Sequence, residues 1–239
     1  MVSIFLSGEA VNLCAPIEED FHKWANWFNN TETTKFLDQG KQPNTVVLQK
    51  EFYKEASVSG RLLLMIKTKS MKLLGVISLS EIDYEKSRCQ IAIVCPEKSK
   101  DAPLAALEAM SLVTEHAFQR LGLTRVWAGQ AYPGLLAWTK HLEVLGYKSE
   151  GFQRNSFKHG MLESDGVFIS IVKQDYLRLI SQRKNVLWPG AKSARKMIAI
   201  MKKTPSLAEE LYEVINQRYV IFDKRLGEIE KQVKLEAEK

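Results

Sequence analysis

The chain has 239 residues, of which 45% are hydrophobic and 26% are charged, and it carries a formal net charge of +6. This composition is ample for one good-sized core plus an appendage, and it excludes a disordered chain. No run reaches the roughly 18 apolar residues of a membrane span, and the first residues lack the basic start and long apolar stretch of a signal peptide. These features predict a cytoplasmic protein.

Cysteine and histidine usage argues against a disulfide framework and against a metal site. Cys14, Cys89 and Cys95 are odd in number, and two of them lie in one apolar run, which favours reduced, packed thiols. The four histidines have no metal-ligand spacing relative to one another or to a cysteine. We therefore expect no bound metal.

The N-terminal third predicts a strand, two helices and a hairpin. The expected ranges are a strand over 9–15, helices over 18–29 and 46–56, and paired strands over 61–67 and 73–79. Thr45 is the expected N-cap of the second helix. A loop rich in Thr, Gly, Asn and Pro joins the two helices over 30–44.

The central stretch, residues 87–151, predicts alternating strands and helices. Alternation over Ser87–Cys95 indicates a largely buried strand, and Pro96 ends it. A long helix is expected to start with Asp101 as its cap and Pro103 in its first turn, and to close at Gly122. The next elements are expected to be a strand over 123–128, a turn over 132–134 and a shorter helix that ends at Gly146.

The C-terminal quarter combines a last strand pair with a basic helical extension. Strands are expected over 152–158 and 167–172, which completes a first domain over 1–180 and leaves 181–239 as the extension. Within the extension, 183–203 carries seven Lys or Arg and no acidic residue, beside an apolar stripe that marks a basic amphipathic helix. Such a helix docks on its own domain, lies on an anionic membrane at the inner membrane face, or holds an acidic protein partner. Nucleic acid is disfavoured, because no recognised binding motif accompanies the charge.

The last expected helix begins at a capping box of Ser206 and Glu209. Apolar residues then recur at spacings of three and four from Leu211 to Val233, close to a heptad seam. This pattern is typical both of a helix that packs on its own domain and of a coiled coil. It leaves homo-oligomerisation through 207–235 open.

Two helix endings carry a family resemblance. They are Glu115-His-Ala-Phe-Gln-Arg-Leu-Gly-Leu-Thr-Arg-Val126 and Leu142-Glu-Val-Leu-Gly-Tyr-Lys-Ser-Glu-Gly151. With the order of elements, they resemble the GNAT superfamily of N-acetyltransferases over 8–173, most of all the branch of ribosomal-protein N-terminal acetyltransferases and nucleotide-amino-sugar N-acetyltransferases. The runs Phe36-Leu-Asp-Gln-Gly-Lys-Gln-Pro-Asn44 and Ile82-Asp-Tyr84 look like the amino-sugar group. The resemblance implies an α/β fold, a mixed central sheet flanked by helices, with the helical extension added at its C-terminus.

The resemblance also implies acetyl-coenzyme A as cofactor, although the motif that binds its phosphates is degenerate. Family members wrap the pyrophosphate with a glycine-containing loop before the long helix, and this chain has Ser99, Ala102 and Leu104 at the corresponding positions. Pro103 has no N–H to donate, and Lys98 and Lys100 offer point charges instead. The cofactor-binding positions implied in this way are Ile93, Val94, Cys95, Lys98, Ser99, Lys100, Ala102, Leu104 and Leu135.

The catalytic positions of the family are also altered. Leu142 stands where a tyrosine is often the general acid, and Gln90 stands where a glutamate is common on the central strand. The remaining candidates for acid–base chemistry are His141, Glu81 and Asp83. Each also fits a structural role, His141 as an ordinary helix residue and the two acids as solvated groups near a strand end.

Two functions follow from these observations. The first is an N-acyltransferase that moves an acetyl or other acyl group from coenzyme A to a primary amine, with a nucleotide-linked amino sugar as the favoured acceptor. The second is a catalytically silent GNAT-like domain that serves as a scaffold or binding subunit. The chain-long resemblance supports the first, and the altered cofactor and catalytic positions support the second.

Overall fold

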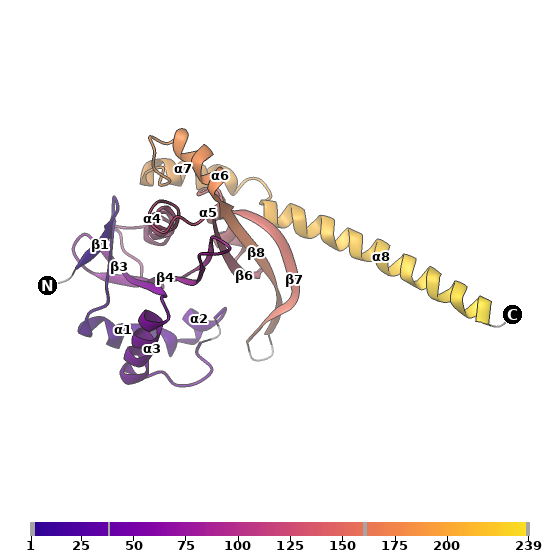
Figure 1. Ribbon diagram of the computed structural model, residues 1–239, viewed down its shortest axis with the longest axis horizontal. Coiled ribbons are helices and arrows are strands. Elements are labelled where there is room, and N and C mark those ends of the chain that lie inside the picture. Colours follow the sequence, from indigo (N-terminus) through magenta and orange to yellow (C-terminus); the bar gives the residue numbers. More distant parts are fainter. Residues whose placement is uncertain (1–2, 38, 160–161, 238–239) are drawn as a thin grey trace.

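The computed structural model describes residues 3–37, 39–159 and 162–237, and its body is built on one mixed sheet (Figure 1). The eight strands are ordered β1-β2-β3-β4-β5-β6-β8-β7. Their bounds are β1 Ile4–Ser7, β2 Val11–Cys14, β3 Leu62–Thr68, β4 Leu73–Asp83, β5 Arg88–Val94, β6 Arg125–Tyr132, β7 Lys148–His159 and β8 Leu162–Val172. All neighbours are antiparallel except β5 and β6, which are parallel.

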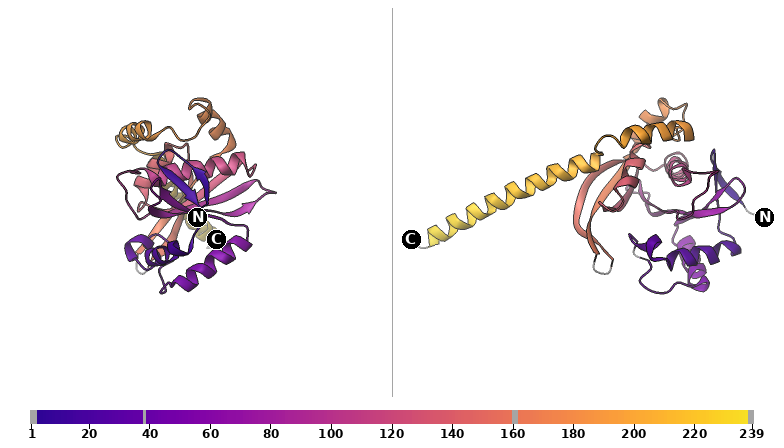
Figure 2. Two further views of the ribbon diagram at one scale, coloured as in Figure 1. Left: turned by 90° about the vertical axis from the view of Figure 1, so that its left-hand side faces the viewer. Right: turned by 180° about the vertical axis from the view of Figure 1, so that it is seen from behind.

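Helices cover both faces of this sheet (Figures 1 and 2). Their bounds are α1 Glu18–Phe28, α2 Thr31–Thr34, α3 Val46–Val58, α4 Ala105–Gln119, α5 Leu136–Glu143, α6 Lys173–Ser181, α7 Ala191–Met201 and α8 Leu207–Ala237. Helices α1, α2 and α3 lie on one face, α4 to α7 lie on the other, and α8 projects away from the body. The mixed α/β fold with a C-terminal helical addition is the predicted one.

The alternation of apolar residues explains why both faces are buried. In β4, Leu74, Ile77 and Leu79 join the core under α4, while Leu73 and Val76 face a second core under α1 and α3. A strand with apolar residues on both faces must be covered twice, because successive side chains point to opposite sides of the sheet. The aromatic face of α1 provides much of the second core, through Phe21, Trp24, Trp27 and Phe28.

Helix caps and turns follow the sequence closely, with one exception. The Thr45 hydroxyl accepts a hydrogen bond from Leu48 N at 3.2 Å, and Ser206 and Glu209 form the expected reciprocal cap. Gly122 adopts a left-handed φ of 70°, as its place after the long helix predicts. The exception is the start of that helix: α4 begins at Ala105 without a side-chain cap, so the prediction of Asp101 as cap is wrong. The intervening residues form a separate turn, in which Ala105 N donates to Ala102 O.

A buried ion pair fixes α1 to the sheet. Lys67 Nζ on β3 lies 2.8 Å from Asp20 Oδ1 on α1, and the two side chains are 3% and 6% exposed. The other carboxylate oxygen of Asp20 accepts from Ile17 N at 3.0 Å, at the first turn of α1. Helices α1 and α2 lie together on one face of the sheet (Figure 1), and this ion pair ties α1 on that face to strand β3.

The basic helix of the extension docks on its own domain. Leu187 and Ile198 belong to the same core as α4 and the sheet, and Ala194 is fully buried. Glu9 accepts hydrogen bonds from Trp188 Nε1 at 2.8 Å and from Ala191 N at 2.9 Å, and the bond from Trp188 lowers the pKa of the Glu9 carboxyl. The lysines and arginines of α7 remain exposed, so contact with an anionic membrane or an acidic protein stays a prediction. Within the described residues, no helix is long and apolar enough to cross a membrane.

Candidate active site

A cleft opens where the two parallel strands of the sheet separate. Strands β5 and β6 pair only from Arg88 to Gln90 against Arg125 to Trp127. Beyond Gln90, β5 continues beside β4 and β6 continues beside β8, and a cavity of about 460 Å³ lies between them. We call it the β5–β6 cleft. Its described lining is Glu32, Thr33, Phe36, Leu37, Gln90, Ile91, Ala92, Ile93, Val94, Cys95, Pro96, Ala106, Met110, Ala128, Gly129, Gln130, Leu135 and Trp138.

The splitting of the sheet leaves the cleft side of β5 available for hydrogen bonding. Residues 91–94 of β5 are held by β4 on one side, and within the described chain no β6 residue pairs with them on the other. Backbone groups at such an edge can bind an extended amide-containing chain as an added strand. The cleft therefore suits a long, narrow ligand that carries amides.

Two helix N-termini open onto the same cleft. Ala106 in the first turn of α4 and Leu135 at the start of α5 both line it, and neither helix has a side-chain cap. The first N–H of each helix donates to a backbone carbonyl, Ala105 N to Ala102 O and Leu136 N to Pro133 O. The next N–H groups of the first turn, together with the positive end of the helix dipole, favour an anion such as a phosphate. The residues present thus fit a phosphate-bearing cofactor, although not through a glycine-rich loop.

The loop between β5 and α4 is anchored at its beginning. Glu97 Oε1 accepts a hydrogen bond from Trp27 Nε1 at 3.1 Å and lies 3.4 Å from Lys23 Nζ on α1. The Trp27 bond lowers the pKa of the Glu97 carboxyl. These contacts couple the loop to α1.

The predicted cofactor residues divide into two groups. Ile93, Val94, Cys95 and Leu135 line the cleft together. The others do not: Lys100 and Leu104 line a separate hollow of about 450 Å³ on the β2–β3 side of the loop, and Ala102 is 3% exposed in the core. Lys98 and Ser99 lie in the loop, where Ser99 Oγ accepts from Asp101 N at 3.3 Å. The geometry thus supports the strand and short-helix positions more strongly than the loop positions.

His141 faces away from the cleft. It lines a smaller hollow of about 250 Å³ between α5 and α7, with Ile198, Met201 and Lys202. Burial, with a smaller contribution from Lys202, lowers the pKa of His141, so the imidazole is predominantly neutral at neutral pH. The assignment of His141 as a catalytic acid is not supported by this geometry, because the helix turns its side chain toward the extension.

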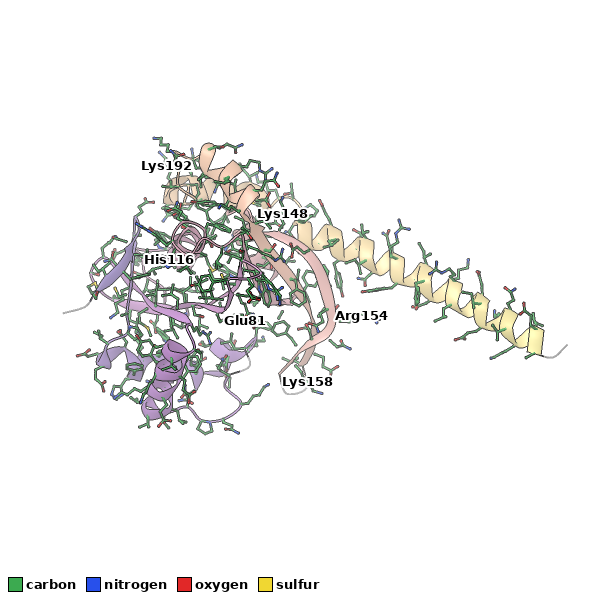
Figure 3. The ribbon with its side chains drawn as sticks, in the orientation of Figure 1. Glu81, His116, Lys148, Arg154, Lys158 and Lys192 are labelled. Atoms are coloured by element: carbon green, nitrogen blue, oxygen red, sulfur yellow. The ribbon has the colours of Figure 1, made fainter. Side chains whose placement is uncertain are left out.

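Glu81, labelled in Figure 3, and Asp83 lie at the end of β4, and neither is among the cleft-lining residues. The register between β4 and β5 shifts between Ser80 and Asp83, and Glu81 adopts a left-handed φ of 50° with an exposed side chain. Asp83 accepts a hydrogen bond from Lys86 N at 2.9 Å, and this bond lowers the pKa of the Asp83 carboxyl. A turn-stabilising role accounts for Asp83, and a lowered pKa weakens it as a base.

Two side-chain amides in the cleft were missed or undervalued by sequence reasoning. Gln130 is 5% exposed, and its Oε1 accepts from Thr139 Oγ1 at 2.9 Å, which leaves its amide N–H groups as the donors on the cleft side. Gln90 lies at the fork of the strands, and its Oε1 accepts from Ser80 Oγ at 3.3 Å. A polar residue on the inward face of an apolar strand was the sequence signal for Gln130.

The remaining chemistry of the cleft is limited. Burial raises the pKa of the Cys95 thiol to about 12, so Cys95 does not serve as a thiolate nucleophile. Glu32 is the one carboxylate among the described lining residues. Elsewhere in the described chain, no group of three His, Cys, Asp or Glu side chains is arranged to hold a metal ion.

A second hollow lies beside the loop that follows α2. Its volume is about 460 Å³, and its described lining is Phe28, Gln39, Gly40, Lys41, Gln42, Pro43, Asn44, Leu48, Gln49 and Phe52. We call it the amide hollow, because four of these side chains are Gln or Asn. Asn44 Nδ2 donates to Gln49 Oε1 at 2.7 Å, which orders part of this lining.

The split sheet and its helix N-termini define a protein class that holds an extended, phosphate-bearing carrier between two parallel strands. The model of the acetyltransferase (GNAT) domain matches residues 11–132, slightly more than half of the 239 residues. The chain therefore belongs to the GNAT acetyltransferase family. Acetyl-coenzyme A is the acyl donor of this family.

Solved structures confirm the fold at low sequence identity. RimJ of Mycobacterium smegmatis, in complex with CoA-disulfide, is 13% identical, with a TM-score of 0.62 over 72% of this chain and 88% of that chain. The spermidine N-acetyltransferase of Vibrio cholerae, in complex with CoA and spermine, is 18% identical, with a TM-score of 0.61 over 70% of this chain and 98% of that chain. The Microcin C7 self immunity acetyltransferase MccE, in complex with acetyl-CoA and AMP, is 16% identical, with a TM-score of 0.58 over 69% of this chain and 93% of that chain. No curated protein matches the chain.

Proposed function

We propose that this chain is a coenzyme A-dependent N-acetyltransferase whose acceptor is the primary amine of a nucleotide-linked amino sugar. The observation that carries the proposal is the β5–β6 cleft, onto which two uncapped helix N-termini open. Bound acetyl-coenzyme A would supply the acyl thioester. The free edge of β5 fits its amide-containing arm, and the N-termini of α4 and α5 fit its phosphates.

The chain's own contribution to the reaction is positioning and hydrogen bonding. Gln90 and Gln130 present amide groups at the cleft, and an amide N–H can stabilise the oxygen on which negative charge develops. Neither amide can take a proton from the amine, so the acceptor arrives neutral, loses its proton to water, or loses it to Glu32, the one carboxylate of the described lining. Orientation of the amine and the carbonyl supplies the rest of the rate.

The amide hollow supports a hydroxyl-rich acceptor, such as the sugar of a nucleotide-linked amino sugar. Gln39, Gln42, Asn44 and Gln49 can each donate and accept hydrogen bonds, which suits sugar hydroxyls. A polyamine would need carboxylates, and the described lining of the hollow contains none. The resemblance of residues 36–44 to the amino-sugar group points in the same direction.

Titration of the purified protein with acetyl-coenzyme A, followed by turnover assays on amino-sugar nucleotides, polyamines and peptide N-termini, tests the proposal. We expect binding and preferential acetylation of the sugar nucleotide. Binding without product from any acceptor would identify the chain as a catalytically silent domain. The absence of binding at millimolar ligand would overturn the proposal, since even a weak site stabilises the fold at that concentration.

A matched pair of variants locates the site. Ala106→Glu places a carboxylate at the N-terminus of α4 in the cleft, and we expect it to weaken coenzyme A binding at least tenfold. Ala199→Glu makes the same change at an exposed position near the C-terminal end of α7, away from both helix N-termini, and should leave binding unchanged. Equal affinities for the two variants would place the cofactor elsewhere.

A further inference from the structure

The long C-terminal helix leaves the body after its first turns (Figures 1 and 2). Ala208 is fully buried, and the Tyr212 ring packs on Tyr132 and Phe152 at centroid distances of 4.6 and 4.9 Å. Among the described residues, the outermost ring contact between α8 and the body is that of Arg154 on β7, labelled in Figure 3, whose guanidinium lies 5.0 Å from the centroid of Tyr219. The rest of α8 runs into solvent.

The apolar stripe that docks α8 on the body continues along its free part. Ala208, Tyr212, Ile215 and Tyr219 alternate at spacings of four and three, and the same spacing continues through Phe222, Leu226, Ile229 and Val233. These are successive a and d positions of one heptad repeat, with Tyr219, Leu226 and Val233 at a. The outer four side chains are 44% to 59% exposed. An ordered seam of this kind in solvent marks an interaction surface.

The charges beside the seam identify what covers it. The g positions hold Arg218 and Arg225, and the e positions hold Asp223 and Glu230. In a parallel pair of identical helices, each g residue faces the e residue five positions further on in the partner helix, so Arg218 meets Asp223 and Arg225 meets Glu230. In an antiparallel pair, arginine would face arginine and acid would face acid. The pattern is therefore self-complementary in the parallel orientation alone.

We propose that α8 forms a parallel coiled coil with the α8 of a second copy of this chain, from Phe222 to the end of the helix. The two bodies then lie at the same end of the pair, with each inner seam from Ala208 to Tyr219 kept on its own domain. The paired stretch of about fifteen residues is roughly 22 Å long. Because it is this short, the association is concentration-dependent and falls in the micromolar range.

Sedimentation of the full-length chain over a range of concentrations tests the association. We expect a shift from one chain of 27.2 kDa towards twice that mass. Leu226→Lys should raise the dissociation constant at least a hundredfold, because the dimer loses a seam residue on both helices. Val220→Lys is the matched control: Val220 is 69% exposed and lies at a b position outside the seam, so its variant should associate normally.

Cysteine cross-linking tests the orientation. In a parallel, in-register pair, Val233 at an a position lies opposite its own counterpart, so Val233→Cys should form a disulfide-linked dimer on mild oxidation. Val220→Cys should not. Arg225→Glu should weaken association, and Arg225→Glu combined with Glu230→Arg should restore it.

Three results would overturn the proposal. A monomer at every concentration would show that the chain does not associate. Equal cross-linking at positions 220 and 233 would show that the proposed seam is not the contact face. Tighter association of Arg225→Glu would indicate antiparallel helices.

Discussion

Removal of the buried lysine that holds α1 should destabilise the whole domain. The change is Lys67→Met, which keeps most of the aliphatic stem and deletes the charge. It leaves the Asp20 carboxylate, 6% exposed, without its cation. A charge stranded in this way is expensive, because burial has already removed its water.

The magnitude follows from what Asp20 retains. Breaking a buried ion pair by removing one partner costs about 3–5 kcal/mol. Asp20 keeps its hydrogen bond from Ile17 N at 3.0 Å, so the lower end, about 3 kcal/mol, is expected. In a domain of this size each 1 kcal/mol lowers the Tm by about 2–4 °C, so the expected loss is about 6–12 °C.

Urea denaturation and a thermal melt provide the measurement, with two controls. Lys50→Met on α3 removes the ion-pair partner of Glu18, which lies on α1 as Asp20 does. The Lys50 and Glu18 side chains are 40% and 70% exposed, so the loss of stability should stay below about 1 kcal/mol. The double variant Asp20→Leu with Lys67→Met should recover much of the loss, since no charge is then left buried. The reasoning is refuted if Lys67→Met and Lys50→Met cost the same.

Further predictions concern the site and its supports. Gly134→Ala puts a Cβ about 2.4 Å from a ring carbon of Phe36, so the loop at the cleft must shift, and we expect a several-fold rise in the acceptor KM without loss of fold, measured by initial rates. Desolvation raises the pKa of Glu108, whose carboxylate accepts a hydrogen bond from Ala10 N at 3.0 Å. The contribution of Glu108 to the free energy of unfolding is therefore full below its ordinary pKa of 4.5 and falls as the pH rises through its raised pKa in the folded protein. Glu108→Gln should remove that fall, so its stability relative to the wild type should increase from pH 4.5 to 7.5 in urea titrations, and a constant difference would contradict this. His141→Ala should lower the Tm and leave turnover unchanged, because His141 lies between α5 and α7; a selective loss of turnover would return it to the catalytic residues.

The predictions from sequence were most accurate for features that depend only on residues close together in the chain. Alternating apolar residues predicted β5, and spacings of three and four predicted α4 and α8, since each reflects the geometry of a single element. Thr45 and the pair Ser206 and Glu209 were recognised as caps because the groups involved lie within four residues of one another. The strand β1 was missed, since its four residues are too short for a period to be distinguished from a loop.

The site depended on information that no local pattern holds. Sequence alone could not show whether His141 or Gln130 faces the cleft, because both sit among apolar residues and the choice depends on which neighbour covers each face. The packing of Phe36, which lines the cleft, on Gly134 joins segments almost a hundred residues apart.

The sequence by itself thus determined most of the elements, their order and the family, because periodicity, caps and turn residues act over a few residues. Only the tertiary structure decided where β5 and β6 separate, which helix N-termini meet at the opening and that α7 docks on the body while α8 docks only through its first turns. These properties depend on the register between strands and on the balance of contacts between distant segments. The same apolar stripe in α8 is buried at Ala208, packs on the core at Tyr212 and is exposed from Tyr219 onward, and only the position where the body ends makes the difference.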